Sequence, residues 1–370
     1  MMQWREGMVE AETGRWPGAV EYAVQLAPTA DLTSPPASCR ALAYTALVGE
    51  PRPGDRVLLN ASALLRGLGT GGLAFVVAMP DRLPPDTAAR PGHIVKARYT
   101  PQQQMLLAVD EQESPHHEAL READDLAAMP VVAADLHSAL PAIVAGLRAD
   151  SPDVRVAYVM TDGGALPAAF SRTVAGLRSA GWLAATLTVG QSFGGDHEAV
   201  SVHTGLLAAR LVVGADVAVV VQGPGNVGTG TRWGFSGVGA GEALNAAHTL
   251  HGRPVAALRV SEGDQRARHR GVSHHSLTAY GRVFLGQADL PVPALPGPLG
   301  RLVADQARDL RDSARGTLNL VEVATEGLDE ALAGCPVPLS TMGRGLEQDR
   351  AAFVAAAAAG RHAAHLLLNP

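Results

Sequence analysis

The sequence has few lysines, cysteines and aromatic residues. Lys96 is the single lysine among 30 lysine and arginine residues, so arginine supplies nearly all of the positive side-chain charge. Aromatic residues make up 4% of the chain, which leaves the core to alanine, valine and leucine. Cys39 and Cys335 lie too far apart for the closely spaced pairs of thiol redox motifs and zinc fingers. So few cysteines are typical of a protein of the reducing cytoplasm.

Long apolar runs and an excess of basic residues are also missing. No stretch reaches the roughly 18 consecutive apolar residues of a membrane span. The start at Met1–Trp4 lacks the apolar region of a signal peptide. The net charge of −6 argues against nucleic acid as the main partner. We therefore expect a cytoplasmic protein with no membrane or nucleic-acid partner, and homo-oligomerisation stays open.

With 370 residues, 47% of them hydrophobic and 18% charged, the chain is long enough for two folded domains. Residues 1–110 contain short apolar runs separated by turns rich in proline and glycine, such as Pro35-Pro36 and Gly67–Gly72. This spacing predicts a β-rich domain, either a small antiparallel barrel or a sandwich. The polar stretch Asp110–Pro115 is the predicted linker. The predicted strands are Val20–Leu26, Ala41–Val48, Arg56–Leu59, Leu73–Met79 and His93–Arg98.

Residues 111–370 change to an alternation of strand-length apolar runs and longer helical patterns. Strand and helix, repeated four times, predict an α/β domain with a doubly wound, mostly parallel sheet between layers of helices. The predicted strands are Val131–His137, Val154–Asp162, Leu183–Val189, Val217–Gln222, Pro254–Val260 and Thr317–Val323. The predicted helices are Ser138–Ala149, Pro167–Ala180, Glu198–Val213, Gly239–His251 and Ala351–Leu368.

Acids, amides, hydroxyls, histidines and glycines follow the predicted parallel strands. Ligands of open α/β sheets bind at the carboxyl ends of the strands, so this pattern predicts a ligand site there. Asp162 and Asp196 stand beside glycine pairs, where missing side chains let a ligand approach. Together with His137, the two carboxylates could bind a divalent metal. Catalytic acid–base roles for the carboxylates and plain helix caps or turns are the alternatives. The glycine pairs are Gly163, Gly164 and Gly194, Gly195.

A glycine-rich loop follows the strand Val217–Gln222. Gly223, Gly225 and Gly228 match the dinucleotide fingerprint as a string, but further glycines keep the chain irregular where a helix should begin. The loop instead offers many backbone N–H groups to a phosphate or carboxylate, together with the hydroxyls of Thr229 and Thr231. A purely structural glycine loop is the alternative.

The segment from Arg268 to His275 is dense in cations. Arg268 and Arg270 suit the oxygens of a phosphate or carboxylate. His269, His274 and His275 could serve as general acids or bases. Adjacent side chains on a helix diverge by about 100°, so we expect only one of His274 and His275 in a site. A solvated basic loop or a subunit contact is the alternative.

These motifs together resemble an uncharacterised bacterial family known as domain of unknown function 3866. The resemblance covers nearly the whole chain, and it implies a soluble bacterial protein of about this length. It brings no activity with it. The segments that carry it are Arg56–Val77, Met160–Pro167, Phe193–Ala199, Gly223–Gly237, Arg268–His275 and Ser340–Gly345.

The sequence as a whole predicts an enzyme that acts on a phosphorylated or otherwise anionic small molecule, by metal-assisted hydrolysis or group transfer. The cofactor stays open, with a divalent metal as the candidate. A non-catalytic nucleotide or sugar-phosphate sensor would use the same cleft, and turnover separates it from the enzyme. A protein-interaction scaffold is the third hypothesis, and it predicts a stable complex without small-molecule binding.

Overall fold

The computed structural model describes residues 2–28, 37–69, 71–86, 88 and 90–368, so the turn expected at Pro35-Pro36 lies outside the described residues. The chain divides into two compact units. The first contains residues 1–90 and 100–104, and the second contains residues 91–99 and 105–370.

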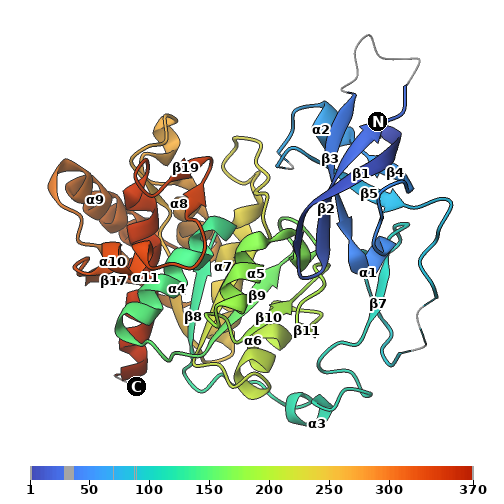
Figure 1. The fold of residues 1–370 in the computed structure, drawn as a ribbon. Helices are drawn as coiled ribbons and strands as arrows, with labels where there is room; N and C mark the ends of the chain where they lie inside the picture. Colours follow the sequence, from blue (N-terminus) through green and yellow to red (C-terminus); the bar gives the residue numbers. More distant parts are fainter. Residues whose placement is uncertain (1, 29–36, 70, 87, 89, 369–370) are drawn as a thin grey trace. The chain divides into compact units, whose positions relative to one another are not determined.

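The first unit is a closed five-stranded barrel (Figure 1). Its strand order is β1-β2-β3-β5-β4, and β1 closes the barrel by pairing with both β2 and β4. The pairs are antiparallel except β3 with β5, which are parallel, as in five-stranded Greek-key barrels. The elements are β1 (Trp4–Trp16), β2 (Ala19–Leu26), β3 (Ser38–Tyr44), α1 (Thr45–Val48), β4 (Arg56–Asn60), α2 (Ser62–Leu65) and β5 (Leu73–Ala78).

The sequence interpretation differs from the barrel at three places. The strand expected at His93–Arg98 is not part of the barrel, because Ile94–Lys96 forms a short strand of the second unit. The strand expected at Ala41–Val48 ends at Tyr44, because the chain turns into the short helix α1. Trp4–Trp16 was not predicted as a strand, because charged and polar residues interrupt its apolar positions. Pairing on both sides stabilises β1 despite this weak local pattern.

The second unit is a parallel eight-stranded sheet with helices on both faces, which confirms the α/β prediction. The sheet order is β11-β10-β9-β12-β8-β13-β16-β17. The strands are β8 (Pro130–Ala134), β9 (Val156–Thr161), β10 (Ala185–Thr188), β11 (His197–Glu198), β12 (Val217–Gln222), β13 (Arg253–Ala256), β16 (Gln287–Pro293) and β17 (Thr317–Val323). Shorter strands outside the barrel and the eight-stranded sheet are β6 (Ile94–Lys96), β7 (Gln104–Leu106), β14 (Val260–Ser261), β15 (Gly271–Val272), β18 (Ser340–Thr341) and β19 (Arg344–Gly345).

Alternate residues of the central strands build two separate cores. Val132 and Val219 belong to the core on one face, whereas Val131 and Val220 belong to the core on the other. Continuous apolar strands are expected when helices cover both faces. The first face is covered by α4 (Leu140–Asp150), α5 (Arg172–Ser179), α10 (Leu328–Ala333) and α11 (Arg350–Leu368). The second is covered by α3 (His117–Leu120), α6 (Val202–Leu211), α7 (Gly239–Thr249) and α9 (Gly297–Ser313), and by the π-helical turn that follows α8 (His274–Thr278).

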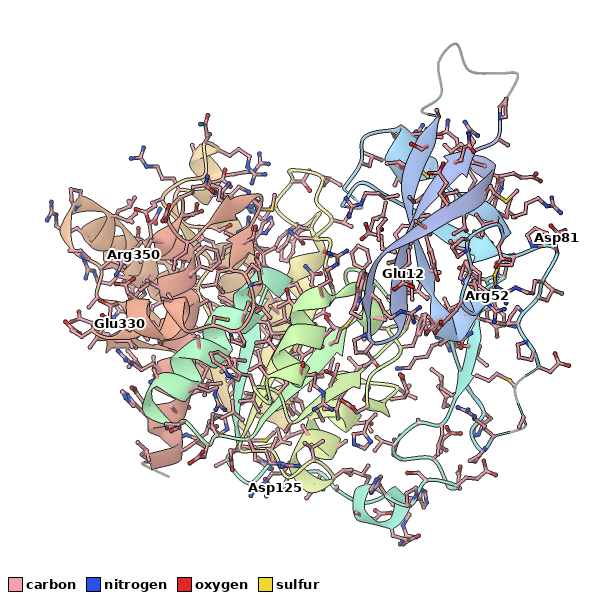
Figure 2. All side chains as sticks on the ribbon, in the orientation of Figure 1. Glu12, Arg52, Asp81, Asp125, Glu330 and Arg350 are labelled. Carbon is pink, nitrogen blue, oxygen red and sulfur yellow. The ribbon has the colours of Figure 1, made fainter. Side chains whose placement is uncertain are left out.

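The helices α4 and α11 cross at very close range. A Cβ atom at Gly146 would collide with the carbonyl of Ala357, and one at Gly360 would collide with the carbonyl of Ile143. Arg350 begins α11 and holds Asp329 of α10 in a two-bond ion pair, beside Glu330 (Figure 2). Among the described helices, α11 alone is long and apolar enough to cross a membrane, yet 72% of its apolar window is buried inside the structure. It is therefore packed as a core helix.

Three expectations for the second unit are corrected. The stretch Asp110–Pro115 is no linker, because it lies inside the unit, where Glu111 and Ser114 are buried. The helix expected from Glu198 begins at Val202, since Glu198 pairs in the edge strand β11. The strand β16 was missed because it carries two prolines, which usually argue against an inner strand.

Candidate metal centre

Loops from three neighbouring strands converge at the carboxyl edge of the sheet. The strands β12, β8 and β13 lie side by side. The chain leaves β8 for α4 on one face and leaves β12 for α7 on the opposite face. Such a change of direction creates the switch point at which doubly wound sheets bind ligands. Asp135 follows β8 and Arg259 follows β13, so both stand at this point.

Asp135 is a buried carboxylate in contact with an arginine and a histidine. Its Oδ2 atom lies 3.0 Å from His275 Nδ1 and accepts a hydrogen bond from Arg259 Nη1 at 3.2 Å. Burial alone would raise the pKa of Asp135, but Arg259 and His275 overcome that effect and hold the pKa below its usual range. A cavity of about 30 Å³ is lined by Asp135 and Arg259, with room for one or two water molecules.

His275 also belongs to a cluster of three histidines from the cation-rich segment. One ring nitrogen each of His269, His274 and His275 lies within 4.8 Å of the corresponding atoms of the other two. The ring centroids of His274 and His275 are 4.5 Å apart, so both adjacent histidines join the cluster. The expectation that only one of them could do so is wrong, because α8 begins at His274 and the two rings turn toward each other at its first turn.

The free nitrogens of the cluster suit a metal ion. His275 Nδ1 lies 3.0 Å from Asp135 Oδ2 and 2.9 Å from Arg259 Nη1, and His269 Nδ1 lies 2.8 Å from Ser273 Oγ, so Nε2 is the nitrogen of each ring that faces no such partner. The Nε2 atom of His274 is buried and has no hydrogen-bond partner among the described residues. An orphaned buried nitrogen is costly unless a ligand satisfies it. Ligand nitrogens of a tetrahedral zinc ion lie about 3.3 Å apart, so modest ring rotations would complete such a site.

Both outer histidines are held in the neutral form. Burial lowers the pKa of His269 to about 3, with a further contribution from the Arg259 cation. Burial also lowers the pKa of His274 to about 4, assisted by the charges of His275 and Arg268. Neutral imidazole is the form that binds metals. The cluster therefore suits a metal ion better than it suits an anion that would need charged imidazolium rings.

The local chain conformation explains why these rings meet. Gly271 has a φ of +68°, and a Cβ atom there would collide with the side chain of Gln306. Ser273 caps α8 by accepting a hydrogen bond from the backbone N–H of His275 at 3.2 Å. After Thr278 the helix widens into a π-helical turn, which brings the Tyr280 hydroxyl within 3.0 Å of Ala133 O and 2.9 Å of Ala257 O. The turn thus ties the histidine segment to the ends of β8 and β13.

The glycine-rich loop reaches the same centre as an ordered hairpin, drawn in yellow in Figure 1. Asn226 Oδ1 accepts hydrogen bonds from Gln222 Nε2 at 3.0 Å and Ser236 Oγ at 2.8 Å, which fixes the base of the loop. Phe235 stacks on the ring of His275 with centroids 3.8 Å apart and ring planes 6° apart. The next helix begins only at Gly239, so the loop does not form a dinucleotide-binding turn.

Most of the predicted anion-binding residues lie on or beside this hairpin. Thr229 and Thr231 are exposed at its tip, with their hydroxyl oxygens 3.1 Å apart. Gly225 and Gly230 have positive φ angles there, and the hairpin strands pair between Gly228 and Phe235. The first residue of the loop, Gly223, is buried where a Cβ atom would meet the carbonyl of Ala165.

Both predicted arginines are available to a ligand. The guanidinium of Arg268 lies within 4.0 Å of the Cβ position of Gly230, so it stands against the hairpin tip. Arg268 and Arg270 are exposed, and no ion pair joins either of them to another described residue. Arg266, by contrast, is bound to Asp264 through two hydrogen bonds of 2.9 and 2.7 Å.

The metal site expected from His137, Asp162 and Asp196 is not assembled. His137 uses both ring nitrogens within the protein, since Nε2 lies 2.7 Å from Ser171 Oγ and Nδ1 lies 3.3 Å from Gln222 O. Burial lowers the pKa of His137 to about 4.

The two carboxylates of that expected site point elsewhere. The Oδ2 atom of Asp162 accepts the backbone N–H of Gln191 at 2.8 Å. Asp196 pairs with Arg178 at 2.8 Å and with the backbone N–H of Thr186 at 2.7 Å. Because Thr186 lies near the start of β10, Asp196 is turned back along that strand and away from the carboxyl edge.

The neighbouring glycine pairs have packing roles. A Cβ atom at Gly163 would collide with Gln222, and one at Gly164 would collide with the carbonyl of Gly223. A Cβ atom at Gly195 would lie 2.7 Å from the carbonyl of Thr186, and Gly194 has a φ of +89°. These glycines let adjacent loops pack closely.

Sequence reasoning missed three residues that the structure makes prominent. Asp135 lies near the carboxyl end of the predicted strand Val131–His137, which is the signal that could have identified it, and Arg259 lies near the end of the predicted strand Pro254–Val260. The third is Lys96, whose buried Nζ atom donates to the carbonyls of Thr188 and Ser192, both at 2.8 Å. It also lies 2.9 Å from Glu198 Oε2. The feature that could have identified Lys96 is that it is the single lysine in a chain rich in arginine. A planar guanidinium does not match a site that offers three acceptors to a tetrahedral ammonium.

Comparison with known proteins gives a family and no activity. A model of the protein family of unknown function DUF3866 matches residues 40–360, from within β3 to within α11. No curated protein and no solved structure matches the sequence. The resemblance expected from the sequence motifs is confirmed, since the match covers most of the chain. This chain belongs to DUF3866, a family of proteins of unknown function.

Proposed function

We propose that this protein is a metal-dependent enzyme that acts on a phosphorylated or otherwise anionic small molecule, by hydrolysis or group transfer. The observation that carries the proposal is the convergence of three imidazoles, His269, His274 and His275, of which His274 has a buried nitrogen that lacks a partner among the described residues. The metal centre replaces the one that the sequence suggested around Asp162.

The residues around the histidines fit a catalytic metal. The three histidines would hold a metal such as zinc with one position open, and the metal would supply Lewis-acid chemistry toward a substrate oxygen. Asp135 Oδ2 lies 3.0 Å from His275 Nδ1, and when Nδ1 carries the proton such a carboxylate orients a ligating histidine and increases its basicity. Ser273 plays the corresponding part for His269.

The charges around the centre favour an anionic substrate. Asp135 is paired with Arg259, while Arg268 and Arg270 carry charges without an ion-pair partner among the described residues. A divalent metal would add to this local excess in a chain whose net charge is −6. An anionic group could therefore bind between the metal, Arg268 and the hairpin of Gly223–Thr231. We propose a cytoplasmic location as well, and a homo-oligomer stays a prediction.

Metal binding is the first test. Protein stripped with a chelator is loaded with Zn²⁺ or Co²⁺, the metal content is measured by mass spectrometry, and the Co²⁺ form is examined by visible absorption. We expect one metal per chain and the intense absorption of a tetrahedral cobalt site. His274→Ala and His269→Ala should weaken binding at least about tenfold, whereas His203→Ala, on the exposed side of α6, should not.

Turnover then separates an enzyme from a sensor. The metal-loaded protein is incubated with a panel of phosphate esters and other anionic compounds, and product formation is followed directly. An enzyme converts at least one class of compound, and His274→Ala removes the activity. Full metal binding by His274→Ala would overturn the metal centre, and ligand binding without conversion would support the sensor.

A further inference from the structure

The tip of the glycine-rich hairpin displays an aromatic ring on a fixed turn. The backbone N–H of Thr229 donates to Gly234 O at 2.7 Å, and the backbone N–H of Gly234 donates to Thr231 Oγ1 at 3.1 Å. Between these bonds lies Trp233, whose side chain is 51% exposed. Burying a tryptophan removes a large apolar area from water, so an exposed ring on an ordered turn is a strong contact for a ligand.

The same hairpin is fixed to the candidate metal centre. Phe235, two residues after Trp233, stacks on His275 and meets His274 edge to face, with ring centroids 6.1 Å apart. The backbone N–H of Ser236 also donates to Val227 O at 2.9 Å. A rigid link of two residues therefore joins the exposed ring to the metal-binding rings.

Arg268 supplies a charge at the hairpin tip. It precedes the metal-ligand candidate His269, and its guanidinium stands against Gly230 at the hairpin tip. Thr229 and Thr231 place exposed hydroxyls on either side of that glycine. A guanidinium beside hydroxyl groups suits the oxygens of a phosphate.

We propose that Trp233 and Arg268 select substrates in which a phosphate is joined to a planar ring, as in a nucleotide. The phosphate lies on Arg268 and points to the metal, and the planar base stacks on Trp233. Stacking on an aromatic side chain tolerates different bases, because every base has a π face. This inference rests on the proposed function and names its substrate class.

The test compares two phosphates that differ in the planar base. Adenosine monophosphate and ribose 5-phosphate are titrated into zinc-loaded protein by calorimetry, and metal content is measured on the same samples. The wild-type protein should bind adenosine monophosphate about tenfold more tightly than ribose 5-phosphate. Trp233→Ala should remove this difference, and Trp233→Phe should retain most of it. Arg268→Gln should weaken both ligands by at least about tenfold.

Trp4→Ala is the matched control, because Trp4 is 43% exposed in the barrel unit. It should leave both affinities unchanged. Equal affinities for the two phosphates in the wild type, or an unchanged preference in Trp233→Ala, would overturn the inference. If the metal is bound while the nucleotide is not preferred, the substrate class is wrong and the metal centre stands. If no metal is bound by the wild type, the proposed function itself is wrong.

Discussion

Lys96 Nζ and Glu198 Oε2 lie 2.9 Å apart inside the α/β unit, and neither side chain is more than 8% exposed. Burial lowers the pKa of Lys96, while Glu198 acts against that shift. Glu198 is bound in turn by the hydroxyl of Thr188 at 2.7 Å and the backbone N–H of Gly194 at 2.7 Å. The pair fastens the segment of residues 91–99 to the edge of the sheet.

Replacing Lys96 should therefore destabilise the fold. Lys96→Met leaves the Glu198 carboxylate buried without a cation, and breaking such a pair costs about 3–5 kcal/mol. Lys96→Arg should also be destabilising, because a planar guanidinium cannot reach the three acceptors in the same space. Urea unfolding measures the loss. Arg121→Ala, which breaks an exposed ion pair with Glu118, is the control and should change stability by under about 1 kcal/mol. A similarly small loss of stability in Lys96→Met would contradict the stabilising role of the Lys96–Glu198 ion pair.

His137 should make stability depend on pH. Its folded pKa of about 4 lies below the ordinary value of 6.5, so the unfolded chain takes up a proton first as the pH falls. Its contribution is complete above pH 6.5 and is lost between about pH 6.5 and 4. From pH 7.5 to pH 5 the free energy of unfolding should fall by about 2 kcal/mol because of this group. His137→Gln should remove that part of the pH dependence, and an unchanged pH profile would refute the assignment.

Asp135→Asn should weaken metal binding while keeping the side-chain shape. The amide cannot accept the hydrogen bond from His275 with the strength of a carboxylate, and loss of such a partner costs about 10–100-fold in metal affinity. Competition with a coloured chelator measures this ratio, and circular dichroism checks the fold. Asp162→Asn is the matched control and should bind metal as the wild type does. Weaker metal binding by Asp162→Asn than by Asp135→Asn would instead support the metal site that the sequence predicted around Asp162.

Gly146→Ala should separate α4 from α11. Its new methyl group would collide with the backbone of Ala357, which cannot move aside as a side chain can. We expect a loss of about 3 kcal/mol or more, at the upper end of overpacking effects. Gly334→Ala is the control, since the nearest atom to its Cβ position is 3.4 Å away. Thermal unfolding should show a clear drop in midpoint for Gly146→Ala alone, and equal midpoints would contradict the close crossing.

The strand pattern was readable from the sequence because both faces of the sheet are buried. Val217–Gln222 and Thr317–Val323 agree with the structure at both ends. The prolines of β16 concealed a strand that only its neighbours β13 and β17 support. Local patterns predict such elements poorly when pairing supplies the stability.

The sequence predicted where the candidate site lies, but it did not predict all of the residues that form it. Clustered histidines and arginines marked the segment Arg268–His275, but the partner of His275 is Asp135, 140 positions away in the sequence. The spacing of residues along the sequence does not show which distant residues the strand order of the sheet brings into contact. The trio around Asp162 failed for the same reason, because Asp196 turns back along β10.

The isolation of Lys96 also has a practical consequence. Reagents that acylate amines find one lysine in this sequence, and its Nζ atom is enclosed by three oxygen atoms. The folded protein should therefore accept label at its terminal amine long before Lys96 reacts. Counting the attached groups by mass spectrometry over time would then measure how fast the segment of residues 91–99 opens, without an engineered probe.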